Sequence, residues 1–197
     1  MKKPPTLRCS LALGALLVGT AILAVLFFGP EVTPRRGAEH AAIRSYLVWP
    51  PAGNGALAFL SRRERSHLHD VKVLFDAAWI LMAGSLVVLA ASGRRLRAGP
   101  VAQATGVGLL AFVVAVALMA ALDFGRFWEW FHDVLFPGGN WRFPADSAII
   151  RIYPQDYFER FVRDVVVGLV AAAVGLIAGG RRVVRRAALL ASPGTSE

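Results

Sequence analysis

The sequence predicts an all-α integral membrane protein with four transmembrane helices, and its apolar composition and uncharged stretches support this prediction. The chain of 197 residues is 56% hydrophobic and has a mean hydropathy of +0.53, which is more apolar than an ordinary soluble domain. A helix needs roughly 20 apolar residues to cross a bilayer. Four stretches carry no charged side chain: 10–30, 77–93, 98–122 and 165–180.

We expect one integral membrane domain covering residues 1–197. Its predicted helices lie at about 10–30, 62–92, 98–122 and 154–180. Two outer segments, 31–72 and 123–164, connect them, and a cytoplasmic tail follows at 181–197. The first stretch follows a basic start, as in a signal peptide, but its apolar run is longer than the usual core of roughly 7–15 residues. We therefore expect it to remain as a helix.

The distribution of charge predicts the orientation in the membrane. If the N-terminus is cytoplasmic, the inner segments hold ten basic residues and one acidic residue, which accounts for the whole net charge of +9. The outer segments hold 12 basic and 12 acidic residues. The positive-inside rule then places both termini in the cytoplasm. The basic composition follows from topology and gives no reason to expect nucleic-acid binding, because the inner arginines flank helices.

The second outer segment is dense in aromatic residues. It contains 12 of the 20 in the chain: Phe124, Phe127, Trp128, Trp130, Phe131, Phe136, Trp141, Phe143, Tyr153, Tyr157, Phe158 and Phe161. Aromatic rings favour the headgroup layer of a bilayer. We therefore expect the two outer segments to form an aromatic-rich interfacial cap.

Candidate chemistry begins at the start of the helix predicted for 62–92. Ser61 and Glu64 have the spacing of a capping box. Glu64, His67 and Asp70 follow at intervals of three residues and lie along one side of the helix. Two flanking carboxylates would orient an imidazole and raise its basicity. A solvated, salt-bridged helix end is the alternative interpretation. All four histidines fall on the outer side of the predicted membrane: His40, His67, His69 and His132.

A second candidate is His132, which stands among aromatic residues and needs a polar partner if it is buried. Asp133 or Glu129 could supply one. The turn at 138–140 offers backbone amides and the carboxamide of Asn140, which could stabilise an oxyanion. On spacing alone, the segment also fits an interfacial loop with a structural histidine.

Metal binding is a further alternative. His67 and His69 point about 160° apart on a helix and cannot share one ion there, and no His-Glu-x-x-His motif is present. A zinc site built from His67, His132 and a carboxylate remains an alternative interpretation. The protein would then be a zinc-dependent membrane hydrolase. Our preferred interpretation needs no metal and no cofactor. The lone Cys9 excludes an intrachain disulfide.

Two segments resemble a known family. Residues 59–75 contain Ser-x-x-Glu-x-x-His followed by Asp-Val-Lys, with Leu68 where methionine is usual. Residues 131–144 contain Phe-His and Phe-Pro-Gly-Gly-Asn-Trp, and residues 152–158 contain Tyr-Pro-x-x-Tyr-Phe. These patterns resemble the lipoprotein intramolecular transacylase family of four-helix bacterial membrane proteins.

The resemblance implies an enzyme of the bacterial cell membrane with its active site on the outer face. The substrate would be a diacylated lipoprotein among membrane phospholipids. An acyl chain would move from the glycerol to the α-amine of the lipidated cysteine, giving a lyso-form lipoprotein. The reaction needs no enzyme nucleophile, because the amine is tethered near the ester. A non-catalytic membrane protein that binds lipid or lipopeptide is the competing class.

We therefore expect His67 and His132 to act as base and acid, in an order that the sequence leaves open. Asp70 and Glu64 would orient His67, and Asn140 would donate to the oxyanion. The resemblance also implies four substrate contacts: Trp141, Phe131, Tyr153 and Lys72. The sequence does not indicate an oligomeric state.

Overall fold

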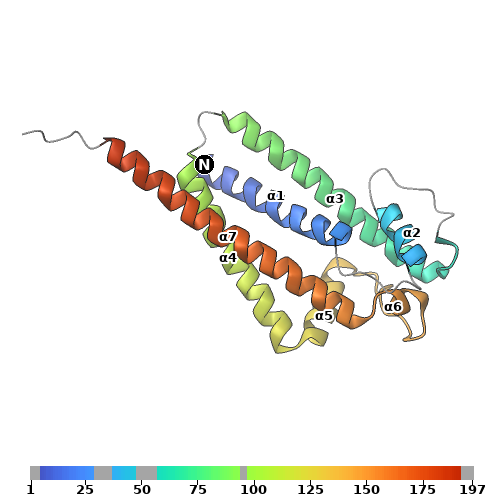
Figure 1. The fold of residues 1–197 in the computed structure, drawn as a ribbon. Coiled ribbons are helices and arrows are strands. Elements are labelled where there is room, and N and C mark those ends of the chain that lie inside the picture. Colours follow the sequence, from blue (N-terminus) through green and yellow to red (C-terminus); the bar gives the residue numbers. More distant parts are fainter. Residues whose placement is uncertain (1–4, 29–36, 48–56, 94–96, 192–197) are drawn as a thin grey trace, which may run out of the picture. The chain divides into compact units, whose positions relative to one another are not determined.

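The computed structural model describes residues 5–28, 37–47, 57–93 and 97–191, and the regular elements in these ranges are all helices. This confirms the predicted all-α class. The helices are α1 Pro5–Phe28, α2 Gly37–Leu47, α3 Arg62–Ser92, α4 Ala98–Leu122, α5 Phe124–Leu135, α6 Ala148–Ile152 and α7 Gln155–Ala191 (Figure 1).

Within these described ranges, four helices are long and apolar enough to cross a membrane, as predicted. They are Thr6–Leu23 in α1 and the long helices α3, α4 and α7. Large apolar side chains on them are exposed, including Ile80 at 74%, Val87 at 67% and Leu122 at 85%. A soluble protein rarely exposes so much contiguous apolar surface. Lipid chains are the natural solvent for these side chains.

The outer segments contain three shorter helices, α2, α5 and α6. α7 continues beyond the predicted end at 180, through the cluster of arginines, to Ala191. Arginine, alanine and leucine all favour the helical conformation, which accounts for this extension. The ends of the predicted first helix and of the tail, residues 29–30 and 192–197, lie outside the described residues, as do 94–96 in the predicted cytoplasmic turn.

The chain divides into two compact units. The first comprises residues 1–21, 81–115 and 166–197. In this unit the backbones of α4 and α7 approach closely at glycine. A Cβ on Gly106 would lie 2.7 Å from the carbonyl oxygen of Ala173, and one on Gly180 would lie 2.7 Å from the carbonyl oxygen of Gly99. Such contacts between small residues are typical of membrane helices, where close van der Waals packing replaces the hydrophobic effect.

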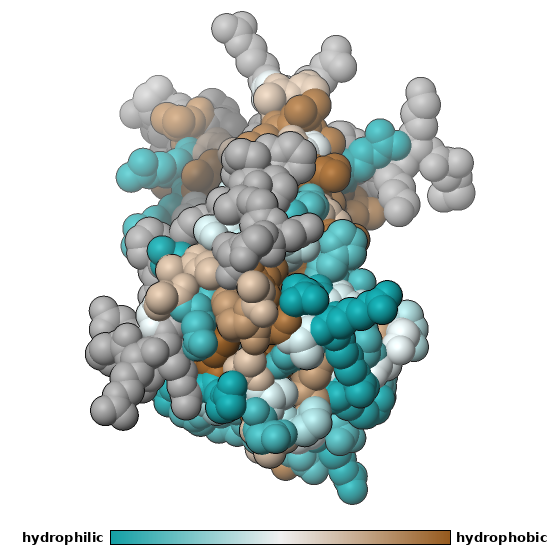
Figure 2. All heavy atoms as spheres, turned by 90° about the vertical axis from the view of Figure 1, so that its right-hand side faces the viewer, coloured by the Kyte–Doolittle hydropathy of each residue, from teal (hydrophilic) through white to brown (hydrophobic). Residues whose placement is uncertain are grey.

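The second unit comprises residues 22–80 and 116–165. It has an apolar core in which α2 packs on the start of α3 and on α6, with these buried residues: Ile43, Tyr46, Leu47, Leu57, Leu60, Leu68 and Ile152. α5 begins directly after α4, because the Asp123 side chain accepts from the backbone N–H of Arg126 and caps the new helix. Polar side chains cover much of the face that carries α2, α6 and the start of α3 (Figure 2).

The close packing of α4 on α7 predicts different effects of alanine at two glycines of α4. We expect Gly106→Ala to lower the melting temperature of the purified protein in detergent, because overpacking costs about 1–3 kcal/mol. Gly108→Ala is the matched control, since its Cβ would meet nothing within 4 Å. Both changes bring the same gain in helix propensity. Equal melting temperatures for the two variants would contradict the close approach.

Candidate active site

The position of His67 is set by the first turn of α3, where the predicted capping box is present. The backbone N–H of Ser61 donates to Glu64 Oε2 at 2.7 Å, and the N–H of Glu64 donates to Ser61 Oγ at 3.3 Å. The other carboxylate oxygen, Oε1, accepts from the N–H of Ile149 at 2.9 Å. Glu64 is only 3% exposed. One buried carboxylate therefore joins the start of α3 to the start of α6.

His67 lies one turn further along α3, buried among rings. Its ring centroid is 4.7 Å from that of Phe136 and 5.5 Å from that of Phe143. The centroid of the His132 ring is 6.0 Å away, with the two planes at 34°. Each of the two histidine residues is 6% exposed. The two histidines, 65 positions apart in the chain, thus lie side by side in one apolar enclosure.

His132 is fixed by its own helix. Its Nδ1 lies 2.9 Å from the carbonyl oxygen of Trp128, one turn earlier in α5. A carbonyl only accepts, so Nδ1 carries the proton and donates in the neutral ring. The lone pair is therefore on Nε2. Aromatic rings pack close by, with the centroids of Trp128 at 4.1 Å and Trp141 at 4.7 Å.

Burial governs the ionisation of His132. It lowers the pKa of the imidazole below its ordinary value, since an apolar enclosure disfavours the charged ring. The hydrogen bond to Trp128 and the charge of Asp133 act in the opposite direction but do not overcome burial. At neutral pH the ring is therefore uncharged and able to take up a proton.

The turn before Trp141 carries a third polar group. Asn140 Nδ2 donates to Asp70 Oδ2 at 2.6 Å and, more weakly, to Ser66 Oγ at 3.4 Å. A carboxylate only accepts, so this contact fixes the orientation of the carboxamide. Gly139 has φ +65°, a backbone conformation that favours glycine. The oxygen of the carboxamide, Oδ1, is buried.

Three buried polar atoms in this region have no hydrogen-bond partner in the described part of the chain. They are His67 Nδ1, Asn140 Oδ1 and the indole Nε1 of Trp141. Most buried polar groups in proteins are hydrogen-bonded. An acceptor, a donor and an imidazole nitrogen near the histidine pair therefore lack the hydrogen bonds that such buried groups normally make.

The structure brings together most of the residues that the sequence singled out. Trp141 and Phe131 contact the His132 ring, with Phe131 edge-on at 5.4 Å. Neither Glu64 nor Asp70 hydrogen-bonds to His67 among the described residues, although both were expected to orient it. Glu64 binds backbone amides and Asp70 binds Asn140. The amide nitrogen of Asn140, which was expected to face an oxyanion, donates instead to Asp70 and Ser66.

Lys72 and Tyr153, the other predicted substrate contacts, have partners elsewhere. Lys72 forms an ion pair with Asp76 at 2.9 Å, and its place five residues after His67 puts it on another side of α3. The hydroxyl of Tyr153 lies 3.0 Å from His40 Nδ1. In the described ranges, neither side chain hydrogen-bonds to an imidazole of the pair.

Sequence reasoning missed the roles of Trp128, Ser66 and Phe143. Trp128 precedes His132 by four positions, so a helix through both would have predicted its carbonyl as the partner of the imidazole. Ser66 gave no such signal, because its partner Asn140 is 74 positions away. For the zinc alternative, no three histidine, cysteine, aspartate or glutamate side chains within the described ranges converge as metal ligands.

Four helices that are long and apolar enough to span a membrane, together with a buried pair of histidines, indicate an integral membrane protein with a polar site. A family model described as lipoprotein intramolecular transacylase Lit matches residues 39–158. This is more than half of the chain, which therefore belongs to that family. The resemblance seen in the sequence is confirmed, and the protein is a bacterial membrane acyltransferase.

Solved structures show the same fold. The membrane integral lipoprotein intramolecular transacylase Lit from Bacillus cereus has a TM-score of 0.83 at 18% identity, covering 94% of this chain and 96% of that one. Its histidine-to-arginine variant gives a TM-score of 0.77 at 17% identity, covering 94% and 92%. Its histidine-to-alanine variant gives 0.77 at 17%, covering 94% of each chain. A comparison with curated proteins found no match.

The burial of His132 predicts how its ring titrates. Because its pKa is lowered, the ring stays neutral near pH 6.5, where an exposed imidazole is half protonated. NMR of histidine labelled at Cε1 in detergent, assigned with His132→Asn, should therefore give a midpoint below 6.5. The unfolded chain binds this proton more readily, so the contribution of His132 to stability falls as the pH drops below 6.5. A midpoint at or above 6.5 would contradict the apolar enclosure.

Proposed function

We propose that this chain transfers an acyl chain within the diacylglyceryl-cysteine of a lipoprotein, from the glycerol oxygen to the α-amine of the cysteine. The C–N bond of an amide forms, the C–O bond of the ester breaks, and one proton passes from the amine to the glycerol oxygen. The observation that carries this proposal is the pair of buried imidazoles 6.0 Å apart. Two rings at this separation can serve one amine and one leaving oxygen on the same substrate.

The hydrogen bond of His132 suggests the order of the two roles. With Nδ1 held by the Trp128 carbonyl, Nε2 is free to accept the proton from the α-amine. His132 is then the base, and His67 passes a proton to the departing glycerol oxygen as it takes up the one that His132 releases. The enclosing rings keep water away, which strengthens polar contacts with the substrate and favours attack by the tethered amine over hydrolysis.

The unpartnered polar atoms supply the remaining contacts. Asn140 Oδ1 is an acceptor, so we assign it to the α-ammonium of the substrate instead of the oxyanion. Asp70 acts as a positioning residue that holds the carboxamide. The indole N–H of Trp141 is a donor that can stabilise the oxyanion of the tetrahedral intermediate.

Other predicted residues position the histidines or offer apolar surface beside them. Glu64 positions His67 through the first turn of α3. Phe131 and Trp141 offer apolar surface to the substrate beside His132. Lys72 and Tyr153 are assigned no direct contact with the substrate, because Lys72 is paired with Asp76 and Tyr153 with His40. With both termini cytoplasmic, the site faces the outer leaflet, which holds the lipidated cysteines and the phospholipids around them.

Removal of either imidazole should abolish acyl transfer. General acid–base catalysis contributes about 10²–10⁴-fold, so His67→Ala and His132→Ala should each lose at least about a hundredfold in rate. The variants would be expressed in a bacterium lacking the activity, and lipoprotein N-termini would be analysed by mass spectrometry for the lyso form.

The matched controls are exposed positions on the same two helices. Val73→Ala on α3 and Glu129→Ala on α5 should leave the lyso form at the level of the unaltered protein. Immunoblots of the membrane fraction would show that all four variants accumulate. Abundant lyso product in both histidine variants would exclude the proposed roles.

The assignment of Asn140 makes a separate prediction. Asn140→Ala removes an acceptor for a charged group, which costs about 1.5–3 kcal/mol, so kcat on a synthetic diacylglyceryl lipopeptide should fall about 10-fold or more. Asp70→Asn should also lower kcat, since the carboxamide of Asn140 is no longer held in one orientation. Asp146→Asn, which changes an exposed acid in the same outer segment as Asn140, serves as the control. An Asn140→Ala enzyme with unchanged kcat and KM would refute the contact.

A further inference from the structure

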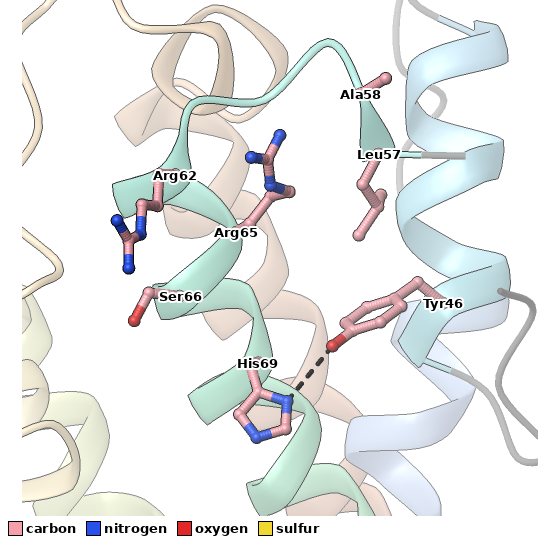
Figure 3. Close-up of a pocket in the computed structure, with 7 residues that line it drawn as sticks. All are labelled: Tyr46, Leu57, Ala58, Arg62, Arg65, Ser66 and His69. Atoms are coloured by element: carbon pink, nitrogen blue, oxygen red, sulfur yellow. Dashed lines mark hydrogen bonds between the residues drawn. The ribbon is translucent and has the colours of Figure 1, made fainter. Parts of the chain in front are cut away.

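A cavity lies on the side of α3 that faces away from His67. It has a volume of about 460 Å³, and Tyr46, Leu57, Ala58, Arg62, Arg65, Ser66 and His69 line it. In Figure 3, Arg62 and Ser66 lie on one side of the α3 ribbon and Tyr46 and Leu57 on the other, toward α2. Arg65 and His69 lie between them. All of these residues belong to the second compact unit.

The lining is basic and polar over an apolar base. Two of its seven members are arginine and none is acidic. Arg62 has no hydrogen-bond or ion-pair partner in the part of the chain that the structure describes, whereas Arg65 donates to the carbonyl oxygen of Leu60 at 2.6 Å. His69 Nδ1 lies 3.4 Å from the hydroxyl of Tyr46, and its other ring nitrogen has no hydrogen-bond partner among the described residues. Guanidinium groups with nearby hydroxyl and imidazole groups are typical ligands of phosphate.

The depth of the cavity suits a headgroup. Arg65 precedes the uncharged stretch of α3, which starts at Ala77, by twelve residues, or about 18 Å of helix. That stretch of 17 residues spans about 25 Å, so the roughly 30 Å of hydrocarbon extends a few ångströms beyond it. Long basic side chains can reach down from this height to the phosphate layer.

We propose that this cavity binds the phosphate group of an anionic glycerophospholipid, with the guanidinium groups of Arg62 and Arg65 as its main ligands. The cavity volume is of the size that holds a small ligand. Ser66 connects the cavity to the catalytic side of α3, because its hydroxyl accepts from Asn140. The site is separate from the acyl-transfer proposal and does not depend on it.

The test measures lipid retention in place of catalysis. Purified full-length protein in detergent, mixed with equal amounts of dioleoyl phosphatidylglycerol and dioleoyl phosphatidylcholine, would be examined by native mass spectrometry. The unaltered protein should retain phosphatidylglycerol in preference. The double variant Arg62→Gln/Arg65→Gln should retain it about tenfold less, as expected for the loss of charge-assisted hydrogen bonds. The same result should hold in a His67→Ala background, which isolates this site from catalysis.

The matched control is Arg126→Gln/Arg151→Gln, which removes two exposed arginines of the outer segments that do not line the cavity. Arg62→Gln alone is a milder variant, because this side chain holds no described part of the fold together, and it should give a partial loss. Equal retention by the unaltered protein and both cavity variants would overturn the proposal, and so would an equal loss in the control.

Inorganic phosphate distinguishes two sources of the same chemistry. Displacement of phosphatidylglycerol by millimolar phosphate would show that the cavity recognises the phosphate group alone. Resistance to phosphate, with loss in the arginine variants, would show that the glycerol and acyl parts of the lipid also contribute. Arginine-dependent binding of an acidic peptide without phosphate, in preference to the lipid, would assign the cavity to the substrate peptide and overturn the proposal.

Discussion

The buried carboxylate of Glu64 is the interaction on which the rest of the site depends. Its two oxygens accept backbone N–H groups from Ser61 and from Ile149, 85 positions later in the chain. The first contact fixes the residue at which α3 begins, and therefore the direction in which His67 points. The second holds the start of α6 against the same turn, close to the segment that carries Asn140 and Trp141. Hydrogen bonds to a charged acceptor are stronger than neutral ones, which suits a contact that must define geometry.

The aromatic cap has two consequences for the histidine pair. Stacked rings exclude water from the imidazoles, and this favours their neutral forms. The same rings limit the positions that each imidazole can occupy, since His132 is contacted by Trp128, Trp141 and Phe136. Burial of two polar rings has an energetic cost that hydrogen bonds normally offset. Here only part of it is offset within the described structure, which is common where a protein is arranged to bind a reactant.

Much of the architecture could be predicted from local sequence. The uncharged stretches indicate the spanning helices, and the Ser61–Glu64 spacing predicts the capping box, because both depend on neighbouring residues. The importance of His67 and His132 could be inferred from residue type and from the family resemblance. Their separation of 6.0 Å could not, since it depends on the packing of α5 against α3.

The orientation of Asn140 shows why such details escape sequence reasoning. A carboxamide has a donor and an acceptor of similar shape, and only its neighbours decide which one faces the site. The deciding neighbour is Asp70, 70 positions away in the chain. The prediction that Asp70 orients His67 used the helical spacing correctly but could not include a partner from another segment.

The ion pair of Lys72 and Asp76 has a consequence for how α3 enters the bilayer. The two charges are one helical turn apart and 2.9 Å from each other, with the lysine side chain 9% exposed and the aspartate 29%. Charged side chains are costly inside hydrocarbon, whereas opposite charges in contact carry no net charge and cost less to insert. About one more turn of α3 can therefore enter the hydrocarbon of a thicker bilayer without burying an unpaired charge. The short uncharged stretch alone would not provide this tolerance to membrane thickness.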